Sequence, residues 1–115
     1  MKLGAGKVDW KGGESTALGL EWSGVMLRGA EILFSGRVQG VGFRYAAKQL
    51  SRRFSVWGTI ENLPDRRVRL LIEGEFSEIE GFLEALLENN HGTVVDTERI
   101  GKPYRGEFSG FEIIG

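Results

Sequence analysis

The hydrophobic pattern of this chain changes twice from the period of a strand to the period of a helix. Strand-like alternation or strand-forming composition marks residues 32–35, 56–62, 67–73, 93–100 and 111–114. Apolar residues recur every three or four positions over residues 43–54 and 79–87. Alternation is typical of a strand with one buried face, and the longer period is typical of a helix with one buried face. The predicted order is β-α-β-β-α-β followed by a short final strand.

This order of elements predicts an α+β fold. A β-α-β-β-α-β chain forms the split βαβ, ferredoxin-like sandwich, in which two helices cover one face of an antiparallel-rich sheet. Ser77, with Glu80 three residues later, has the spacing of a capping box and predicts the start of the second helix. Among the charged strand residues, Glu61 and Glu73 are expected to point outward, away from the helices, which argues against a catalytic role for either.

A glycine-rich turn joins the first predicted strand to the first predicted helix. Residues 36–44 read GRVQGVGFR, and Gly36, Gly40 and Gly42 allow tight or left-handed turns without a Cβ clash. Such a turn before a helix directs several N–H groups into one concavity, which suits an anion. The guanidinium of Arg44, in the first helical turn, has the planar geometry that grips two phosphate oxygens. The turn therefore predicts a phosphate site.

A polar residue ends the predicted strand over residues 56–62. Alternation places Asn62 on the same side as Ile60, which is the side that the helices cover. Because Asn62 ends the strand, its carboxamide is expected at the rim of the core, near the turn and the helix start. A neutral amide both donates and accepts hydrogen bonds, so it can hold a water beside a phosphate without adding a like charge.

Residues 36–44, followed by Gly58-Thr59-Ile60-Glu61-Asn62, together resemble the signature of the acylphosphatases. These small metal-independent enzymes hydrolyse the carboxyl-phosphate bond of acyl phosphates. The resemblance covers the chain from about Arg28 to the C-terminus, and it implies the same ferredoxin-like fold. It also implies a small-molecule acyl phosphate as substrate, inorganic phosphate as product, and neither a cofactor nor a metal.

The resemblance further implies a role for each site residue. The phosphate-binding loop would be formed by Gln39, Gly40, Val41, Gly42, Phe43 and Arg44. The loop amides and the Arg44 side chain would bind the phosphoryl group, and Asn62 would orient the attacking water. The turn after Asn62 departs from the family, since Asp65-Arg66 stands where Asp-Gly is common. A positive φ at Arg66 would cost about 1–2 kcal/mol.

Three other functions fit parts of the pattern. The first is a non-catalytic phosphate-binding module that kept the fold. The second is a stand-alone relative of the acylphosphatase-like domain of hydrogenase-maturation carbamoyltransferases, whose cysteine-rich zinc modules have no counterpart in a chain without cysteine. The third is an RNA-binding ferredoxin-like domain, which requires exposed aromatic residues on the central strands. The outward residues of the strand over residues 67–73 do not supply them.

Composition limits the partners. A net charge of −1 creates no basic field for nucleic acid, and one histidine, His91, excludes a site with several histidine ligands. No apolar run is long enough to cross a membrane or to form a signal peptide. Residues 1–27 are rich in glycine and lack a sustained period, which predicts a flexible extension before an acylphosphatase-like domain over residues 28–115. We expect a cytoplasmic monomer with neither nucleic-acid nor membrane partners.

Overall fold

Seven elements follow one another in the structure, a computed structural model that describes residues 26–40, 42–90 and 93–115. They are β1 (Leu27–Gly36), α1 (Phe43–Ser51), β2 (Val56–Asn62), β3 (Val68–Glu75), α2 (Phe76–Asn89), β4 (Val94–Lys102) and β5 (Phe111–Ile114). This is the β-α-β-β-α-β order with a short final strand that the hydrophobic pattern predicts.

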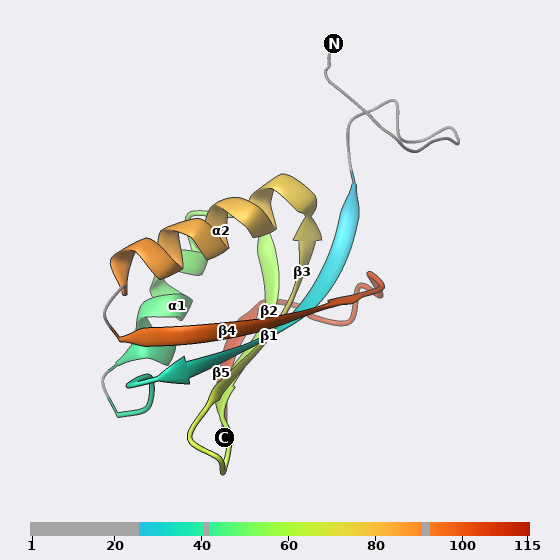
Figure 1. Ribbon diagram of the computed structural model, residues 1–115. Coiled ribbons are helices and arrows are strands. Elements are labelled where there is room, and N and C mark those ends of the chain that lie inside the picture. The colour runs from blue at the N-terminus through green and yellow to red at the C-terminus, as the bar shows by residue number, and fades with distance from the viewer. Residues whose placement is uncertain (1–25, 41, 91–92) are drawn as a thin grey trace.

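The strands form one sheet in the order β4-β1-β3-β2-β5. Neighbouring strands run antiparallel except β5, which lies parallel to β2 at one edge. Both helices lie on the same face of the sheet (Figure 1). The predicted α+β, ferredoxin-like sandwich is confirmed, and β5 extends it beside β2.

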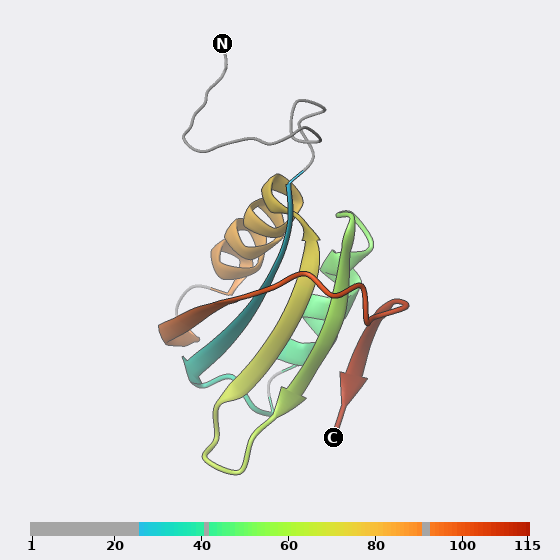
Figure 2. The same cartoon turned by 90° about the vertical axis from the view of Figure 1, so that its right-hand side faces the viewer.

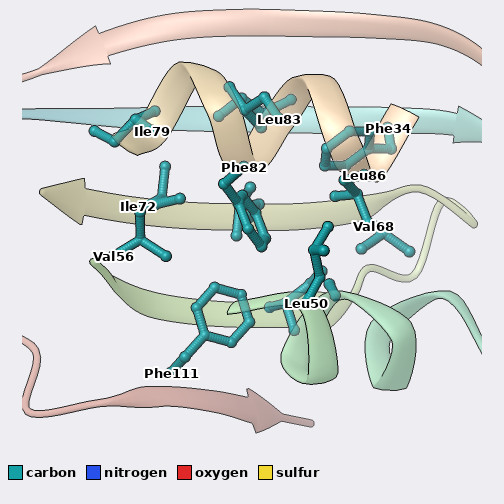
Figure 3. Close-up of a cluster of buried hydrophobic side chains, with 14 of the residues drawn as sticks. Phe34, Leu50, Val56, Val68, Ile72, Ile79, Phe82, Leu83, Leu86 and Phe111 are labelled. Carbon is teal, nitrogen blue, oxygen red and sulfur yellow. The ribbon is translucent and has the colours of Figure 1, made fainter. Parts of the chain in front are cut away.

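The core fills the space between the helices and the sheet (Figure 3). The alternating residues Val68, Leu70 and Ile72 of β3 are each at most 1% exposed, as the period of two predicts. Helix α2 contributes Phe82, whose ring lies 5.7 Å from the ring of Phe111 on β5. Because this aromatic contact joins the edge strand to α2, the core also fixes β5 beside β2.

The start of α2 differs from the prediction. The helix begins at Phe76, and Glu75 is the N-cap, since its carboxylate accepts hydrogen bonds from the amide and the hydroxyl of Ser77. The prediction of a Ser77–Glu80 capping box is therefore wrong. β3 runs directly into the helix, so the extended backbone at Glu75 already occupies the cap position. Glu80 instead pairs with Arg99 of β4, and this hydrogen bond raises the pKa of Arg99.

The connection between β4 and β5 crosses the face of the sheet opposite the helices (Figure 2). Glu73 of β3 lies under it, 5% exposed, and accepts hydrogen bonds from the amides of Arg105 at 2.8 Å and Gly106 at 3.0 Å. The sequence pattern predicts the correct side of the sheet for Glu73 but not its burial. On the same face Glu61 binds Arg69 at 2.7 Å, so both carboxylates have structural partners.

The first strand begins just before the predicted domain boundary at residue 28. β1 starts at Leu27, opposite Glu75 of β3, and the carbonyl of Met26 accepts a hydrogen bond from the Phe76 amide at 2.8 Å. The extension predicted for residues 1–27 falls almost entirely outside the described residues. Neither helix in the described part of the chain is long and apolar enough to cross a membrane.

Candidate active site

The N-terminus of α1 carries no side-chain cap. Gly42 is the N-cap residue, with φ 81° and ψ 12°, and Gly40 also has a positive φ, 76°. The first turn of α1 contains no acidic residue. The first intrahelical bond, from the Ala46 amide to the Gly42 carbonyl, is 2.9 Å long. Because the amides before Ala46 have no partner within the helix, this terminus is a suitable anion site.

The side chain of Gln39 holds the loop against the β2–β3 hairpin. Its Nε2 donates to the carbonyls of Leu63 and Arg67, each at 2.9 Å. The neighbouring Val38 is 1% exposed and belongs to the core, so it also holds the loop in place. Gln39 was predicted only as a loop residue, and its role as an anchor was missed. No local pattern could have found it, because its partners lie 24 and 28 residues further along the chain.

Arg44 lies in the first turn of α1 beside an open cavity. The cavity has a volume of about 210 Å³ and is lined by Val38, Gly40, Gly42, Phe43, Arg44, Tyr45 and Ile113. Nη1 of Arg44 donates to the Ile114 carbonyl over a long distance of 3.4 Å. Among the described residues the guanidinium has no other hydrogen-bond acceptor. Within the described part of the chain, its other N–H groups make no hydrogen bond. The contribution of β5 to this cavity was not predicted.

Asn62 ends β2, opposite Val68 of β3, and is half-buried. Its Oδ1 is fully buried and has no hydrogen-bond partner among the described residues. A buried acceptor that stays without a partner costs about 1–3 kcal/mol, so the oxygen has an unused capacity to accept a hydrogen bond. Gln39 binds the carbonyl of the next residue, Leu63, so the loop is attached to the strand end that carries Asn62. Asn62 itself is not among the residues that line the Arg44 cavity.

The turn that follows Asn62 is held by Asp65. Arg66 has a φ of 76°, so of the two possible turns this hairpin uses the one with a left-handed residue. The carboxylate of Asp65 accepts hydrogen bonds from the amide and the guanidinium of Arg67, at 3.1 and 2.8 Å. The amide hydrogen bond, more than the charge of Arg67, holds the pKa of Asp65 below its usual value. The hairpin therefore keeps a defined shape despite the strained residue.

Two residues named in the sequence analysis lie outside the described part of the structure. Val41 of the phosphate-binding loop is not among the described residues, and neither is His91. Within residues 26–40, 42–90 and 93–115, no three Asp, Glu, His or Cys side chains form a cluster that could hold a metal ion.

The structure defines the class as an α+β protein of ferredoxin-like fold, with an uncapped helix terminus, an arginine beside it and a glycine-rich loop before it. The family model named Acylphosphatase matches residues 30–113. An acylphosphatase of Acaryochloris marina is 33% identical over 82 residues, which cover 71% of this chain and 88% of that relative. The chain belongs to the acylphosphatase family.

Solved structures agree with this assignment. The crystal structure of an acylphosphatase from Bacillus subtilis matches with a TM-score of 0.70 and 31% identity, over 78% of this chain and all of that one (100%). Full-length HypF, crystallised in a phosphate- and nucleotide-bound form, also matches with a TM-score of 0.70 over 79% of this chain. The match is 23% identical and covers 12% of the HypF chain, so this likeness shows the fold alone.

Proposed function

We propose that this member of the acylphosphatase family hydrolyses acyl phosphates by direct attack of water on phosphorus, with Arg44 and Asn62 as its catalytic residues. The observation that carries the proposal is the uncapped, acid-free N-terminus of α1 with Arg44 in its first turn. The helix dipole and the guanidinium both favour a phosphoryl group at this position.

The phosphoryl oxygens would bind the loop amides and the guanidinium of Arg44. The carboxamide of Asn62 has the chemistry to accept a hydrogen bond from a water and so direct the lone pair of that water at phosphorus. The water oxygen bonds to phosphorus, the bond between phosphorus and the bridging oxygen breaks, and the water proton leaves with the phosphate or with solvent. A carboxylate is a good leaving group, so positioning and charge neutralisation supply most of the acceleration.

The role of Arg44 is tested by Arg44→Lys. An ammonium keeps the charge but loses the two parallel N–H donors, so the KM for benzoyl phosphate and the inhibition constant of inorganic phosphate should both rise. Arg53→Lys is the matched control, because Arg53 is exposed just beyond the C-terminus of α1. An Arg44→Lys enzyme with the kinetic constants of the wild type would remove Arg44 from the site.

The role of Asn62 is tested by Asn62→Ala. The kcat for benzoyl phosphate should fall about 100-fold or more, because a misplaced reactant costs roughly that factor. The affinity for inorganic phosphate should change little. Asn89→Ala, at the exposed end of α2, is the control. Weakened phosphate binding with normal kcat would contradict the assignment.

The proposal also covers the boundaries of the active domain, its oligomeric state and its cellular location. Residues 28–115 would form the active domain, as a cytoplasmic monomer that needs no metal and binds no nucleic acid. The near-neutral charge and the family membership support this view. Activity retained in excess EDTA, together with a monomeric mass in light scattering, is the expected result. A dimeric mass, or activity that EDTA abolishes, would contradict it.

A further inference from the structure

The cavity beside Arg44 has an apolar side as well as a cationic side. We propose that Tyr45 and Ile113 bind the acyl group of the substrate and make the enzyme favour aromatic acyl phosphates over acetyl phosphate. This inference rests on the proposed function, because it concerns the part of the substrate that leaves as the carboxylate.

Tyr45 is an aromatic residue that the fold does not use. It follows Arg44 directly in the first turn of α1 and is 64% exposed. The core side of α1 is formed by Phe43, Ala47 and Leu50, each at most 7% exposed. Tyr45 lies off that side, yet it lines the same cavity as Arg44. A large exposed ring beside a polar site can contact a ligand, since aromatic side chains offer large rigid apolar surfaces.

Ile113, which lies near the C-terminal end of the sequence, provides a second apolar surface in this cavity. It lies on β5, packs against the core and also lines the cavity. Val38 and Phe43, each 1% exposed, also line the cavity and supply buried apolar surface there. Arg44 is the charged residue of the lining, and the two glycines contribute backbone alone. The cavity therefore combines a site for an anion with a site for an apolar group.

The connectivity of an acyl phosphate matches this division. One bridging oxygen joins the phosphorus to the acyl carbon, so a phosphoryl group held by the loop keeps the acyl group beside the neighbouring apolar side chains. The volume of about 210 Å³ lies below the roughly 300–1,000 Å³ of pockets that enclose drug-sized ligands. The acyl group would accordingly be small and partly exposed, with one face on Tyr45. A phenyl ring gains such a contact, whereas the single methyl of an acetyl group gains little.

The test compares kcat/KM for benzoyl phosphate and acetyl phosphate in the same variants. Tyr45→Ala should lower kcat/KM for benzoyl phosphate about two- to tenfold, the range of one aromatic contact, with a much smaller change for acetyl phosphate. Tyr45→Phe should restore the preference, because the ring and not the hydroxyl makes the contact. Ile113→Ala should shift the ratio in the same direction, and its melting temperature reports any loss of core packing. The inhibition constant of inorganic phosphate should stay unchanged in Tyr45→Ala.

Tyr104→Ala is the matched control, because Tyr104 is also an exposed tyrosine, at 42%, but lies in the β4–β5 connection and does not line the cavity. An equal loss for both substrates in Tyr45→Ala, or no loss for either, would overturn the inference and leave the proposed function intact. A wild type that hydrolyses neither substrate would instead contradict the proposed function, and the inference with it.

Discussion

The substitution Gln39→Ala removes the side chain that joins the glycine-rich loop before α1 to the β2–β3 hairpin. Gln39 is half-buried and donates two hydrogen bonds of 2.9 Å, to the carbonyls of Leu63 and Arg67. We expect the variant to fold, to be less stable than the wild type, and to hydrolyse acyl phosphates more slowly. The two effects have one cause, since the same two bonds join the loop to the strand end that carries Asn62.

The size of the stability loss depends on which hydrogen bonds the two carbonyls keep in the variant. One neutral hydrogen bond contributes about 0.5–1.5 kcal/mol, so two would contribute about 1–3 kcal/mol. The Leu63 carbonyl still accepts from the Arg66 amide at 3.1 Å, and the Arg67 carbonyl from the Leu63 amide at 2.8 Å. Because neither carbonyl is left without a partner, we expect the lower half of that range, about 1–2 kcal/mol. Each kcal/mol corresponds to about 4–8 °C in melting temperature for a domain of this size.

The assay is urea unfolding followed by circular dichroism, combined with kcat/KM for benzoyl phosphate. We expect kcat/KM to fall about 10- to 100-fold, because a shift of about 1 Å between reacting groups costs up to that factor. Gln49→Ala is the matched control, since Gln49 is exposed on α1 and accepts one hydrogen bond, from Arg52 at 3.2 Å. If Gln39→Ala and Gln49→Ala unfold at the same urea concentration and retain the same activity, Gln39 does not anchor the loop.

Three further predictions concern the turn and the N-terminal segment. Arg66→Gly should stabilise the protein by about 0.5–1 kcal/mol in urea unfolding. The substitution relieves about 1–2 kcal/mol of left-handed strain, which exceeds the cost of the extra chain entropy of glycine, about 0.5–1 kcal/mol. A variant less stable than the wild type would show that Arg66 is not strained. The pKa of Asp65 is lowered on folding, so its contribution is complete above the unfolded value of 3.8 and is lost as the pH falls through the lower folded value. Asp65→Asn should remove this acid dependence from unfolding curves recorded across that window, and an unchanged dependence would assign it to another group. Deletion of residues 1–24 should leave kcat/KM for benzoyl phosphate within about twofold of the value for the full chain, because β1 begins at Leu27. A large loss of kcat/KM would show that the segment is needed for activity.

The fold could be predicted because its signals are local. The period of two in β3 and the helical stripe that includes Phe82 each arise from residues a few positions apart, and both are buried as the pattern requires. The order of the elements then left the ferredoxin-like sandwich as the natural arrangement. The sequence left the conformation of Arg66 open, and the structure gives it the left-handed backbone of φ 76°.

What could not be predicted depends on contacts between distant segments. Glu73 is buried because an irregular connection without any period crosses over it. Gln39 binds carbonyls of a hairpin that follows an entire helix and strand. The turn and the strand alternation pointed to Arg44 and Asn62, and the family resemblance implied their roles. The structure adds the uncapped helix terminus beside Arg44 and the buried amide oxygen of Asn62.

The most direct test of the central claim is hydrolysis of benzoyl phosphate in water labelled with the heavy oxygen isotope, with excess EDTA and mass spectrometry of both products. Direct attack of water on phosphorus predicts rapid turnover with one labelled oxygen in the inorganic phosphate and none in the benzoate. Label in the benzoate would place the attack at the acyl carbon and contradict the roles of Arg44 and Asn62 proposed for this site.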